Sequence, residues 1–391
     1  MKQPTTIHAK VVAIQGAFEA HFVGRDVTPV LLGFVAQEHV FVMGPPGNGK
    51  SALNRALSTC ISGAGYFSVQ LNKFTVVDEV FGPMDLSKFQ NEKKFERNLT
   101  GRLAACHLAN LDEIWKGNGA ALNTTLEPLE ERIYSGQDIP LRCVISSSNE
   151  FPQDTSLAAL YNRFLFRDIT GYDLTRRQKF TLLKRLASKT TAQQQFAPPV
   201  TLTLAEWDEI KAEVEQVSVP DVVINLFLDV VEKMEADGCE MGTRTEIRSV
   251  CKALKASAWL AGESEATVED LQALKYCLWN TPQDREKLVA ILDALERQGA
   301  HKVLQTIDEA MAAYNERPQT QAEIISEFPN LISRIDSAKE EVVAALKSGK
   351  LSKRAAAKVR KRGLEMKAAK EDLGAGFNKS MGVEIVWKDQ A

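Results

Sequence analysis

The fold of this chain is decided by the stretch Phe41-Val42-Met43-Gly44-Pro45-Pro46-Gly47-Asn48-Gly49-Lys50-Ser51. An apolar, strand-like triplet leads into a glycine-rich loop, and a helical pattern without breakers follows it. This is the G-x-x-x-x-G-K-[ST] phosphate-loop pattern in the strand, loop and helix context that it needs. Glycines allow the loop to turn its backbone N–H groups inward, and the helix start adds free N–H groups that attract an anion. The stretch therefore predicts a nucleoside triphosphate site rather than an ordinary glycine-proline turn.

The side chains of Lys50 and Ser51 supply what the backbone of this loop cannot. Lys50 is long enough to reach the β- and γ-phosphates, and Ser51 can offer its hydroxyl to Mg²⁺, which prefers oxygen ligands. The backbone of the preceding loop residues is expected to surround the phosphates, and these residues are Gly44, Pro45, Pro46, Gly47, Asn48 and Gly49.

An acidic pair supplies the second half of the predicted site. The apolar run 104–111 ends in Asp112 and Glu113, although the polar Asn110 is unusual in such a run. In a parallel sheet, the carboxyl end of a buried strand faces the phosphate loop. We therefore expect Asp112 to hold the Mg²⁺ shell and Glu113 to polarise the attacking water. The alternative is an acidic pair on an ordinary surface.

Polar residues near two further segments are additional candidates. The predicted strand 141–148 ends in Asn149, whose amide can bond both the γ-phosphate and the lytic water, or can simply begin a turn. A predicted helix over 157–166 carries Arg163, and Arg167 follows it. Residues at this spacing share one helix face, so the two arginines are either a functional pair or solvated charges.

Length and composition indicate a globular protein of two or three domains. The 391 residues are 44% apolar and 25% charged, and the net charge of −3 does not suggest a general nucleic-acid binder. No apolar run reaches membrane-spanning length and the start lacks a signal segment, so a cytoplasmic location is expected. The six cysteines are dispersed, which favours reduced thiols over a disulfide framework or a zinc site.

Helical patterns occupy most of the remaining chain. Residues 66–71 alternate like a strand, and Gly136 provides the turn of a predicted hairpin over 130–140. A polar, linker-like stretch over 187–200 precedes a long series of helical patterns. The predicted helices are 6–23, 27–36, 114–129, 204–217, 220–236, 244–260, 267–280, 284–316 and 320–372, the last with a break at Gly349.

Together, these motifs resemble the MoxR family of AAA+ ATPases, and most of all its RavA-type branch. The segments that carry the resemblance are 44–51, 78–83, 111–116, 147–150 and 160–164. The resemblance implies an α/β fold with an AAA+ P-loop core and a parallel sheet over 1–170. A small helical lid over 171–282 would follow, and then a C-terminal helical extension over 283–391 that could be a partner-docking hairpin.

The resemblance also implies roles for individual residues. Asn149 matches the sensor-1 position. Arg163 matches the arginine finger that acts on ATP bound by a neighbouring subunit, with Arg167 as the second candidate. Arg244, at the predicted start of a lid helix, fits the sensor-2 position that reads the γ-phosphate, although Arg248 one turn later competes for this role.

For the whole protein, the resemblance implies an ATPase that uses ATP and Mg²⁺, forms a homo-oligomeric ring, usually a hexamer, and remodels a protein client. Members of the family typically work with a partner that carries a von Willebrand factor A domain. Segments 74–89 and 132–140 would be insertions that face the pore or the client.

Two alternative functions stay open. The first is a nucleic-acid-stimulated motor that uses the basic stretch 347–370, which can equally be a solvated helix face. The second is a nucleotide-gated scaffold that binds ATP without turnover, against which Glu113 and Arg163 argue. The strand-like end over 382–387 could pair with the sheet edge of another chain.

Overall fold

The computed structural model describes residues 6–47, 49–152, 157–171, 174–188, 195–239, 244–298, 300–315, 321–347 and 353–381. The chain divides into two compact units. The first unit comprises 1–266 with 270–285, and the second comprises 267–269 with 286–391. The predicted division into core, lid and extension at 170 and 282 stays a prediction, because the first unit contains both the sheet and most of the following helices.

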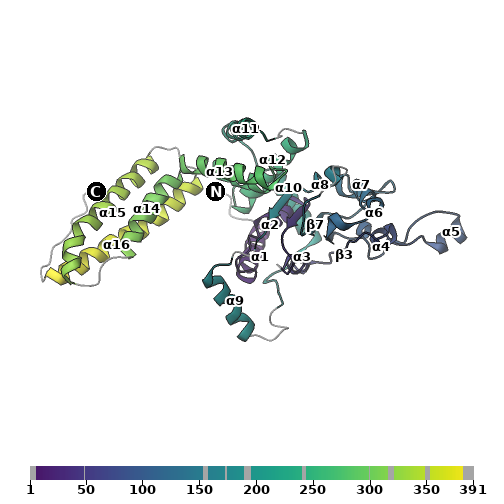
Figure 1. Cartoon of the computed structure of the whole chain (residues 1–391), viewed down its shortest axis with the longest axis horizontal. Coiled ribbons are helices and arrows are strands. Elements are labelled where there is room, and N and C mark those ends of the chain that lie inside the picture. The colour runs from purple at the N-terminus through teal and green to yellow at the C-terminus, as the bar shows by residue number, and fades with distance from the viewer. Residues whose placement is uncertain are drawn as a thin grey trace. The chain divides into compact units, whose positions relative to one another are not determined.

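A five-stranded parallel sheet forms the centre of the first unit (Figure 1). Its strand order is β3 (Tyr66–Gln70), β4 (Leu108–Asp112), β7 (Cys143–Ser148), β1 (Val40–Met43) and β8 (Phe166–Ile169). The predicted α/β fold with a parallel sheet is confirmed. Strand β4 is shorter than predicted because Leu103–Ala105 form a 3-10 turn before it. Strand β8 was not predicted at all, since its centre is the charged pair Arg167 and Asp168.

Aromatic side chains cluster around Phe41 of β1. Phe41 on β1 is fully buried, with ring centroids 5.2 Å from Trp115, 5.9 Å from Tyr161 and 6.1 Å from Phe164. Trp115 lies in the 3-10 turn Ile114–Lys116, immediately after Glu113. Burial of large apolar surfaces is the main stabilising contribution in a core, so this cluster fixes the segment that follows the acidic pair.

The helices around the sheet agree only in part with the predicted ones. Helices α1 (Thr6–His21), α2 (Thr28–Ala36) and α3 (Lys50–Ser58) confirm the expected start of the chain. The single helix predicted over 114–129 is wrong. The chain breaks after the 3-10 turn, and the Asn118 side chain accepts a hydrogen bond from the N–H of Ala120 to begin a new helix. Two short helices result, α6 (Gly119–Thr124) and α7 (Leu126–Glu130).

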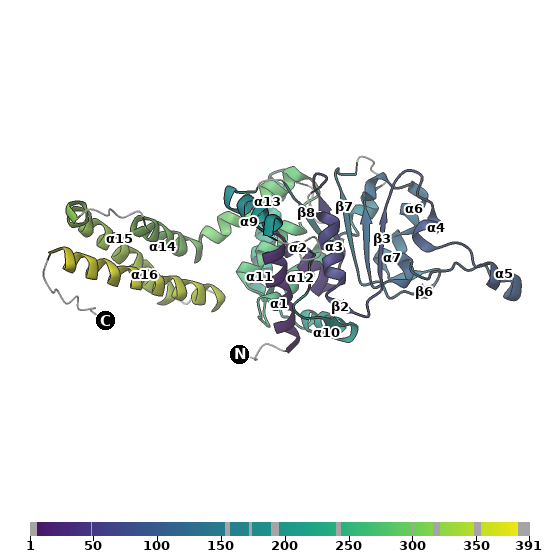
Figure 2. The ribbon, with the colours of Figure 1, turned by 90° about the horizontal axis from the view of Figure 1, so that it is seen from below.

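The predicted hairpin is confirmed, and it holds the base of an insertion. Strands β5 (Ile133–Tyr134) and β6 (Gln137–Asp138) form the hairpin. Tyr134 stacks on Phe81, the last residue of α4 (Val77–Phe81), with ring centroids 4.4 Å apart. Beyond this contact, α5 (Leu86–Glu92) lies on a loop that extends away from the sheet (Figures 1 and 2). The insertion therefore has a fixed base and a projecting end, where Phe95 is 76% exposed.

Among its described residues, the predicted lid region contains four helices, a short strand and a 3-10 segment. Its helices at 204–217, 220–236 and 244–260 are confirmed in type and place, but the helix predicted over 267–280 is a 3-10 segment, Val268–Tyr276. Strand β9 (Leu202–Thr203) pairs with β2 (Ile61–Ser62), two short strands that were not predicted. The helices are α9 (Arg176–Ser188), α10 (Leu204–Glu215), α11 (Asp221–Ala236) and α12 (Arg244–Leu260).

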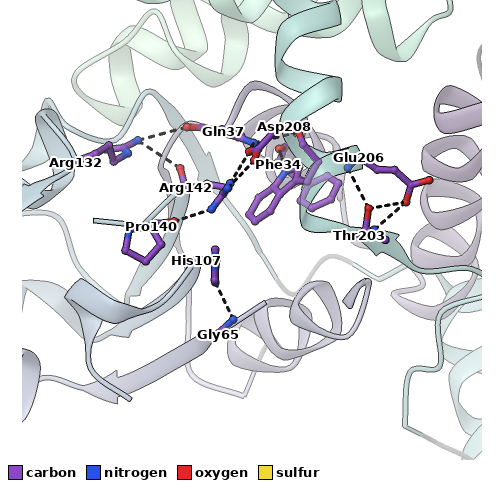
Figure 3. A network of polar contacts seen from close by, with 11 residues as sticks. Phe34, Gln37, Gly65, His107, Arg132, Pro140, Arg142, Thr203, Glu206 and Asp208 are labelled. Carbon is purple, nitrogen blue, oxygen red and sulfur yellow. Dashed lines mark hydrogen bonds and ion pairs between the residues drawn. The ribbon is translucent and has the colours of Figure 1, made fainter. Parts of the chain in front are cut away.

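A polar network fastens α10 to the amino edge of the sheet (Figure 3). The guanidinium of Arg142 makes two bonds to the carboxylate of Asp208, Nε–Oδ1 at 2.6 Å and Nη2–Oδ2 at 2.7 Å. Gln37 Nε2 donates to the same carboxylate at 3.0 Å, and Trp207 Nε1 donates to the carbonyl oxygen of Phe34 at 2.7 Å. The Arg142 bond holds the pKa of Asp208 below its usual value. Paired donors of this kind give a directional contact, so α10 is anchored to the sheet.

The second unit is a helical bundle. Its three long helices are α14 (Ala300–Asn315), α15 (Gln321–Lys347) and α16 (Lys353–Met381), which lie side by side in Figures 1 and 2. Ile307, Ile335 and Val359 are buried between them. Helix α13 (Pro282–Gln298) precedes them, so the described residues on both sides of 299 are helical, as predicted over 284–316, and residue 299 itself lies outside the described part. The strand-like end over 382–387 lies outside the described residues.

Part of the basic stretch 347–370 is paired within this bundle. Arg362 bonds the carboxylates of Asp308 and Glu365, and Lys370 Nζ lies 2.5 Å from Asp336 Oδ1. These contacts favour the interpretation of the stretch as the charged face of a bundle helix. Lys350 and the side chains of Lys353, Arg354 and Lys358 lie outside the described part.

Membrane-spanning helices and disulfides can be examined in the described residues. Within them, no helix is both long and apolar enough to span a membrane. Among the same residues, no cysteine forms a disulfide, and five of the six thiols are buried.

Candidate active site

The phosphate loop joins the end of β1 to the start of α3. Gly47 and Gly49 have φ angles of 77° and 72°, a left-handed conformation that residues with a β-carbon rarely adopt. Gly44 is needed for a different reason, because a β-carbon there would lie 2.5 Å from the carbonyl oxygen of Thr170. Asn48 lies outside the described residues. The glycines of the motif therefore allow both the turn of the loop and its close approach to β8.

Lys50 is the first residue of α3, and its side chain folds back over the loop. The residue is only 7% exposed, and its Nζ donates to the carbonyl oxygens of Gly44 at 2.5 Å and Pro45 at 2.9 Å. Nζ also donates to Asn149 Oδ1 at 3.1 Å. Burial lowers the pKa of Lys50, and the nearby carboxylates of Asp112 and Glu113 raise it. The ammonium group is thus held where the loop would enclose a phosphate chain.

Asp112 ends β4 and is held by three donors. Its carboxylate accepts hydrogen bonds from Ser51 Oγ at 3.0 Å, Ser147 Oγ at 2.6 Å and the backbone N–H of Glu113 at 3.0 Å. These contacts bring together α3, β4 and β7. The predicted closeness of Ser51 and Asp112 is therefore present in the structure.

A hydroxyl and a carboxylate fit Mg²⁺ in particular. This ion prefers oxygen ligands and keeps several of its waters, so in nucleotide sites one or two protein ligands suffice beside the phosphates. The described residues contain no group of three or more His, Cys, Asp or Glu side chains arranged for a metal ion. Ser51 and Asp112 thus match a metal that enters with the nucleotide better than a metal held by the protein alone.

Glu113 follows the strand in a left-handed conformation, with φ of 53°. Its side chain is 13% exposed, and its two oxygens have different partners. Oε1 accepts a hydrogen bond from Asn149 Nδ2 at 2.7 Å, and Oε2 lies 3.0 Å from Lys116 Nζ. Asn149 therefore links Glu113 to Lys50, so one amide connects the predicted base to the predicted phosphate ligand.

Asn110, which is unusual in a buried strand, has a structural explanation. The residue is 2% exposed, and its Oδ1 accepts a hydrogen bond from Asn54 Nδ2 on α3 at 2.5 Å. Its own Nδ2 donates to Ser68 Oγ on β3 at 3.1 Å. Buried amides are tolerated when their bonds are satisfied. This polar bridge fixes α3, and with it the phosphate loop, against two strands of the sheet.

The two arginines expected on one helix face lie on different elements. Helix α8 is only Ala158–Tyr161, so the helix predicted over 157–166 is wrong. Arg163 follows it in a loop, with a side chain that is 24% exposed and bonded to Glu130. Arg167 lies in β8 and is 4% exposed; it donates to the carbonyl oxygen of Trp279 at 2.5 Å and covers the ring of Tyr161. Arg167 therefore has a buried structural role within its own chain.

The two sensor-2 candidates both lie at the start of α12. Arg244 is the first residue of this helix, and Arg248 follows one turn later. The side chains of both residues lie outside the described part of the chain. The assignment of Arg244, with Arg248 as its competitor, stays a prediction.

A cluster of charged residues near the phosphate loop was not predicted from the sequence. It contains Arg25 and Asp26 from the turn after α1, Asp168 from β8, and Arg285 from α13. Arg285 Nη2 lies 3.8 Å from Asp168 Oδ1, and the hydroxyl of Tyr276 donates to Asp26. Burial, and then the charge of Asp26, raises the pKa of Asp168 to about 6. The sequence signal was the Arg25-Asp26 pair, which by itself indicates only a turn.

Asp168→Asn should change the pH dependence of stability. The carboxyl pKa rises from 3.8 to about 6 on folding, so the folded state binds more protons between these values. Stability from this group is therefore present below pH 4 and is lost as pH rises through 6, by at most about 3 kcal/mol. Chemical denaturation followed by tryptophan fluorescence should show this loss in the wild type and not in the variant. Parallel losses in both proteins would contradict the assignment.

Comparisons with known proteins agree with this geometry. Residues 9–201 match the family model described as the MoxR domain in the MoxR-vWA-beta-propeller ternary systems, and 245–292 match the AAA lid domain. Two uncharacterised proteins of Methanocaldococcus jannaschii are each 29% identical. The first matches over 84% of this chain and 81% of its own length, and the second over 70% and 73%.

A solved structure shows the same fold. The crystal structure of an ATPase candidate from Cytophaga hutchinsonii superposes with a TM-score of 0.57 at 15% sequence identity. The match covers 74% of this chain and 94% of that chain.

Proposed function

Because these matches support a MoxR-type AAA+ protein, we propose that the chain hydrolyses ATP and uses the hydrolysis to remodel a protein client. One observation carries the proposal. Lys50, Ser51, Asp112, Glu113 and Asn149 come from three segments of the chain, and hydrogen bonds join them into one connected group at the carboxyl edge of the sheet. A phosphate ligand, a hydroxyl, two carboxylates and an amide are the groups that phosphoryl transfer to water requires.

In this proposal each side chain has one task. Lys50 and the N–H groups of the loop hold the β- and γ-phosphates, and Glu113 accepts a proton from the attacking water while Asn149 orients that water. Ser51 and Asp112 hold Mg²⁺, which, when bound, neutralises charge that develops on the phosphate oxygens. Asn149 bonds Lys50 through Oδ1 and Glu113 through Nδ2, so a γ-phosphate that takes over the Lys50 contact would release Oδ1 to accept a hydrogen bond from the attacking water, while Nδ2 still holds the base.

The remaining cation is supplied by a neighbouring copy. We assign this role to Arg163, which is partly exposed and bonds Glu130 and the carbonyl oxygen of Ala159. The buried contacts of Arg167 leave it unsuited to reach another subunit. A cation lent by a neighbour requires a head-to-tail ring, and a hexamer is the ring size proposed.

The description of the matched family suggests the partners. It names von Willebrand factor A and β-propeller proteins beside the MoxR domain, and we propose that this chain works with a von Willebrand factor A domain protein in the cytoplasm. The projecting insertion that contains α5 and the β5–β6 hairpin share one anchored base. These two elements are the proposed surface toward the client. Assignment to the RavA-type branch stays a prediction.

Lys50→Ala is the direct test of the phosphate loop. Loss of the ammonium removes charge-assisted bonds to two phosphates, so ATP affinity should fall on the order of 100-fold or more. Titration with a fluorescent ATP analogue measures this, and Lys233→Ala, at an exposed position on α11, is the matched control. Retained micromolar binding in the Lys50 variant would show that the nucleotide binds elsewhere.

A further inference from the structure

A second basic side chain adjoins the phosphate loop. The guanidinium of Arg25 reaches the loop from the turn that follows α1, and a β-carbon built on Gly49 would lie 3.8 Å from Arg25 Nη1. Gly49 immediately precedes Lys50, so both cations belong to the surroundings of this loop. We propose that Arg25 is a second cation of the nucleotide site, which contacts the phosphates of ATP or ADP bound in its own copy of the chain. The inference rests on the proposed ATP binding.

The turn that carries Arg25 is held from several directions. The N–H of Arg25 donates to the carbonyl oxygen of Phe22 at 3.1 Å, which closes the turn after α1. Asp26 Oδ1 then accepts the N–H of Thr28 at 3.0 Å and so leads the chain into α2. The hydroxyl of Tyr276 bonds the same carboxylate. Since both neighbours of the turn are fixed, the position of Arg25 beside the loop is part of the fold.

Arg25 has both a carboxylate and a second cation near it. Burial lowers the pKa of Arg25, and the nearby carboxylate of Asp168 raises it. The charge of Arg25 in turn lowers the pKa of Lys50, after the larger effect of burial. A guanidinium stays protonated in proteins, so two positive charges repel one another across this loop. A phosphate chain between them would replace this repulsion with two attractions.

The location favours phosphate over the base of the nucleotide. The loop residues around Gly49 present backbone N–H groups, which bind phosphate oxygens rather than rings. A guanidinium can pair two such oxygens at once because its donors form a rigid fork. Arg25 differs from Arg163 in a testable way. It acts within one copy, so it should strengthen the binding of ATP and ADP alike, with or without a ring.

The experiment compares Arg25→Gln with Arg55→Gln, an exposed arginine on α3, in the full chain. Competition against a fluorescent ADP measures affinities for ATP, ADP and GTP. We expect Arg25→Gln to bind ATP and ADP about 10- to 100-fold more weakly than the control, as for loss of charged hydrogen bonds. The ratio of ATP to GTP affinity should stay that of the wild type. Arg25→Lys should lose less, because it keeps the charge but not the fork.

Each outcome decides between the possibilities. Unchanged ATP and ADP affinity in Arg25→Gln would overturn the inference. It would also be overturned if the ratio of ATP affinity to GTP affinity changed as much as the ATP affinity itself, because that result indicates a contact between Arg25 and the base. If thermal unfolding shows that Arg25→Gln does not fold, Arg25→Lys decides: wild-type affinity for both nucleotides overturns the proposal, and weaker binding of both supports it. Absence of nucleotide binding in the wild type would instead refute the proposed function.

Discussion

Glu113→Gln is expected to bind ATP as the wild type does and to hydrolyse it about 10²–10⁴-fold more slowly. The amide has nearly the shape of the carboxylate and can still bond Asn149, but it cannot accept a proton from water. Binding should persist because Glu113 contacts Asn149 and Lys116, and neither contact belongs to the phosphate loop itself. Phosphate release at saturating ATP measures turnover, and titration with a fluorescent ATP analogue measures binding.

The matched control for this variant is Glu131→Gln, which changes an exposed glutamate outside the connected group. It should retain wild-type turnover. If Glu113→Gln also keeps full turnover, the base lies elsewhere. If it loses ATP binding together with turnover, Glu113 supports the loop structurally and the assignment as base fails.

Arg163→Ala is expected to leave ATP binding intact and to reduce turnover by roughly 10³-fold or more, the range for arginines that stabilise charge in the transition state. Within its own chain, Arg163 contacts Glu130 and the carbonyl oxygen of Ala159, 3.2 Å from Nη1. Its loss should therefore affect a neighbouring site more than its own. Arg55→Ala, which removes an exposed arginine from α3, is the control and should keep normal turnover.

A mixing experiment shows whether the arginine acts between copies. An Arg163→Ala copy keeps Glu113, and a Glu113→Gln neighbour can lend it the missing guanidinium. Mixed rings should therefore regain part of the activity that each variant lacks alone. Absence of rescue at every mixing ratio would contradict action in trans. So would a wild type that stays monomeric with ATP and yet hydrolyses it at full rate.

The core of the site could be predicted because its residues follow simple local patterns. Gly44 to Ser51 follow an apolar run, and so do Asp112 and Asn149. A parallel sheet brings the carboxyl ends of its strands to one edge, so three separate patterns meet in space. The order of these runs alone therefore predicts that Lys50, Asp112 and Asn149 lie near one another. In the structure, hydrogen bonds join Lys50 to Asn149 and Ser51 to Asp112.

The residues that escaped prediction depend on contacts between distant segments. Strand β8 has Arg167 and Asp168 at its centre. A buried strand is predicted from a run of apolar residues, so two charged residues in its middle prevent the prediction. Both charges are tolerated since other segments supply their partners, Trp279 for Arg167 and Arg285 for Asp168. Arg25 likewise lies beside the phosphate loop although the two are far apart in the sequence. The spacing of residues along the sequence does not predict such contacts between distant segments.

The bond between Arg142 and Asp208 has a mechanical consequence. Arg142 precedes β7, and Asp208 lies in α10. Their bond therefore fixes the first long helix after β9 to the amino end of the sheet, which is the edge remote from the phosphates. Helix α12 is tied to α10 in turn, since Trp259 Nε1 donates to Glu213 Oε2 at 2.9 Å. A displacement of α12 caused by nucleotide would therefore be passed through α10 and Arg142 to the amino end of β7.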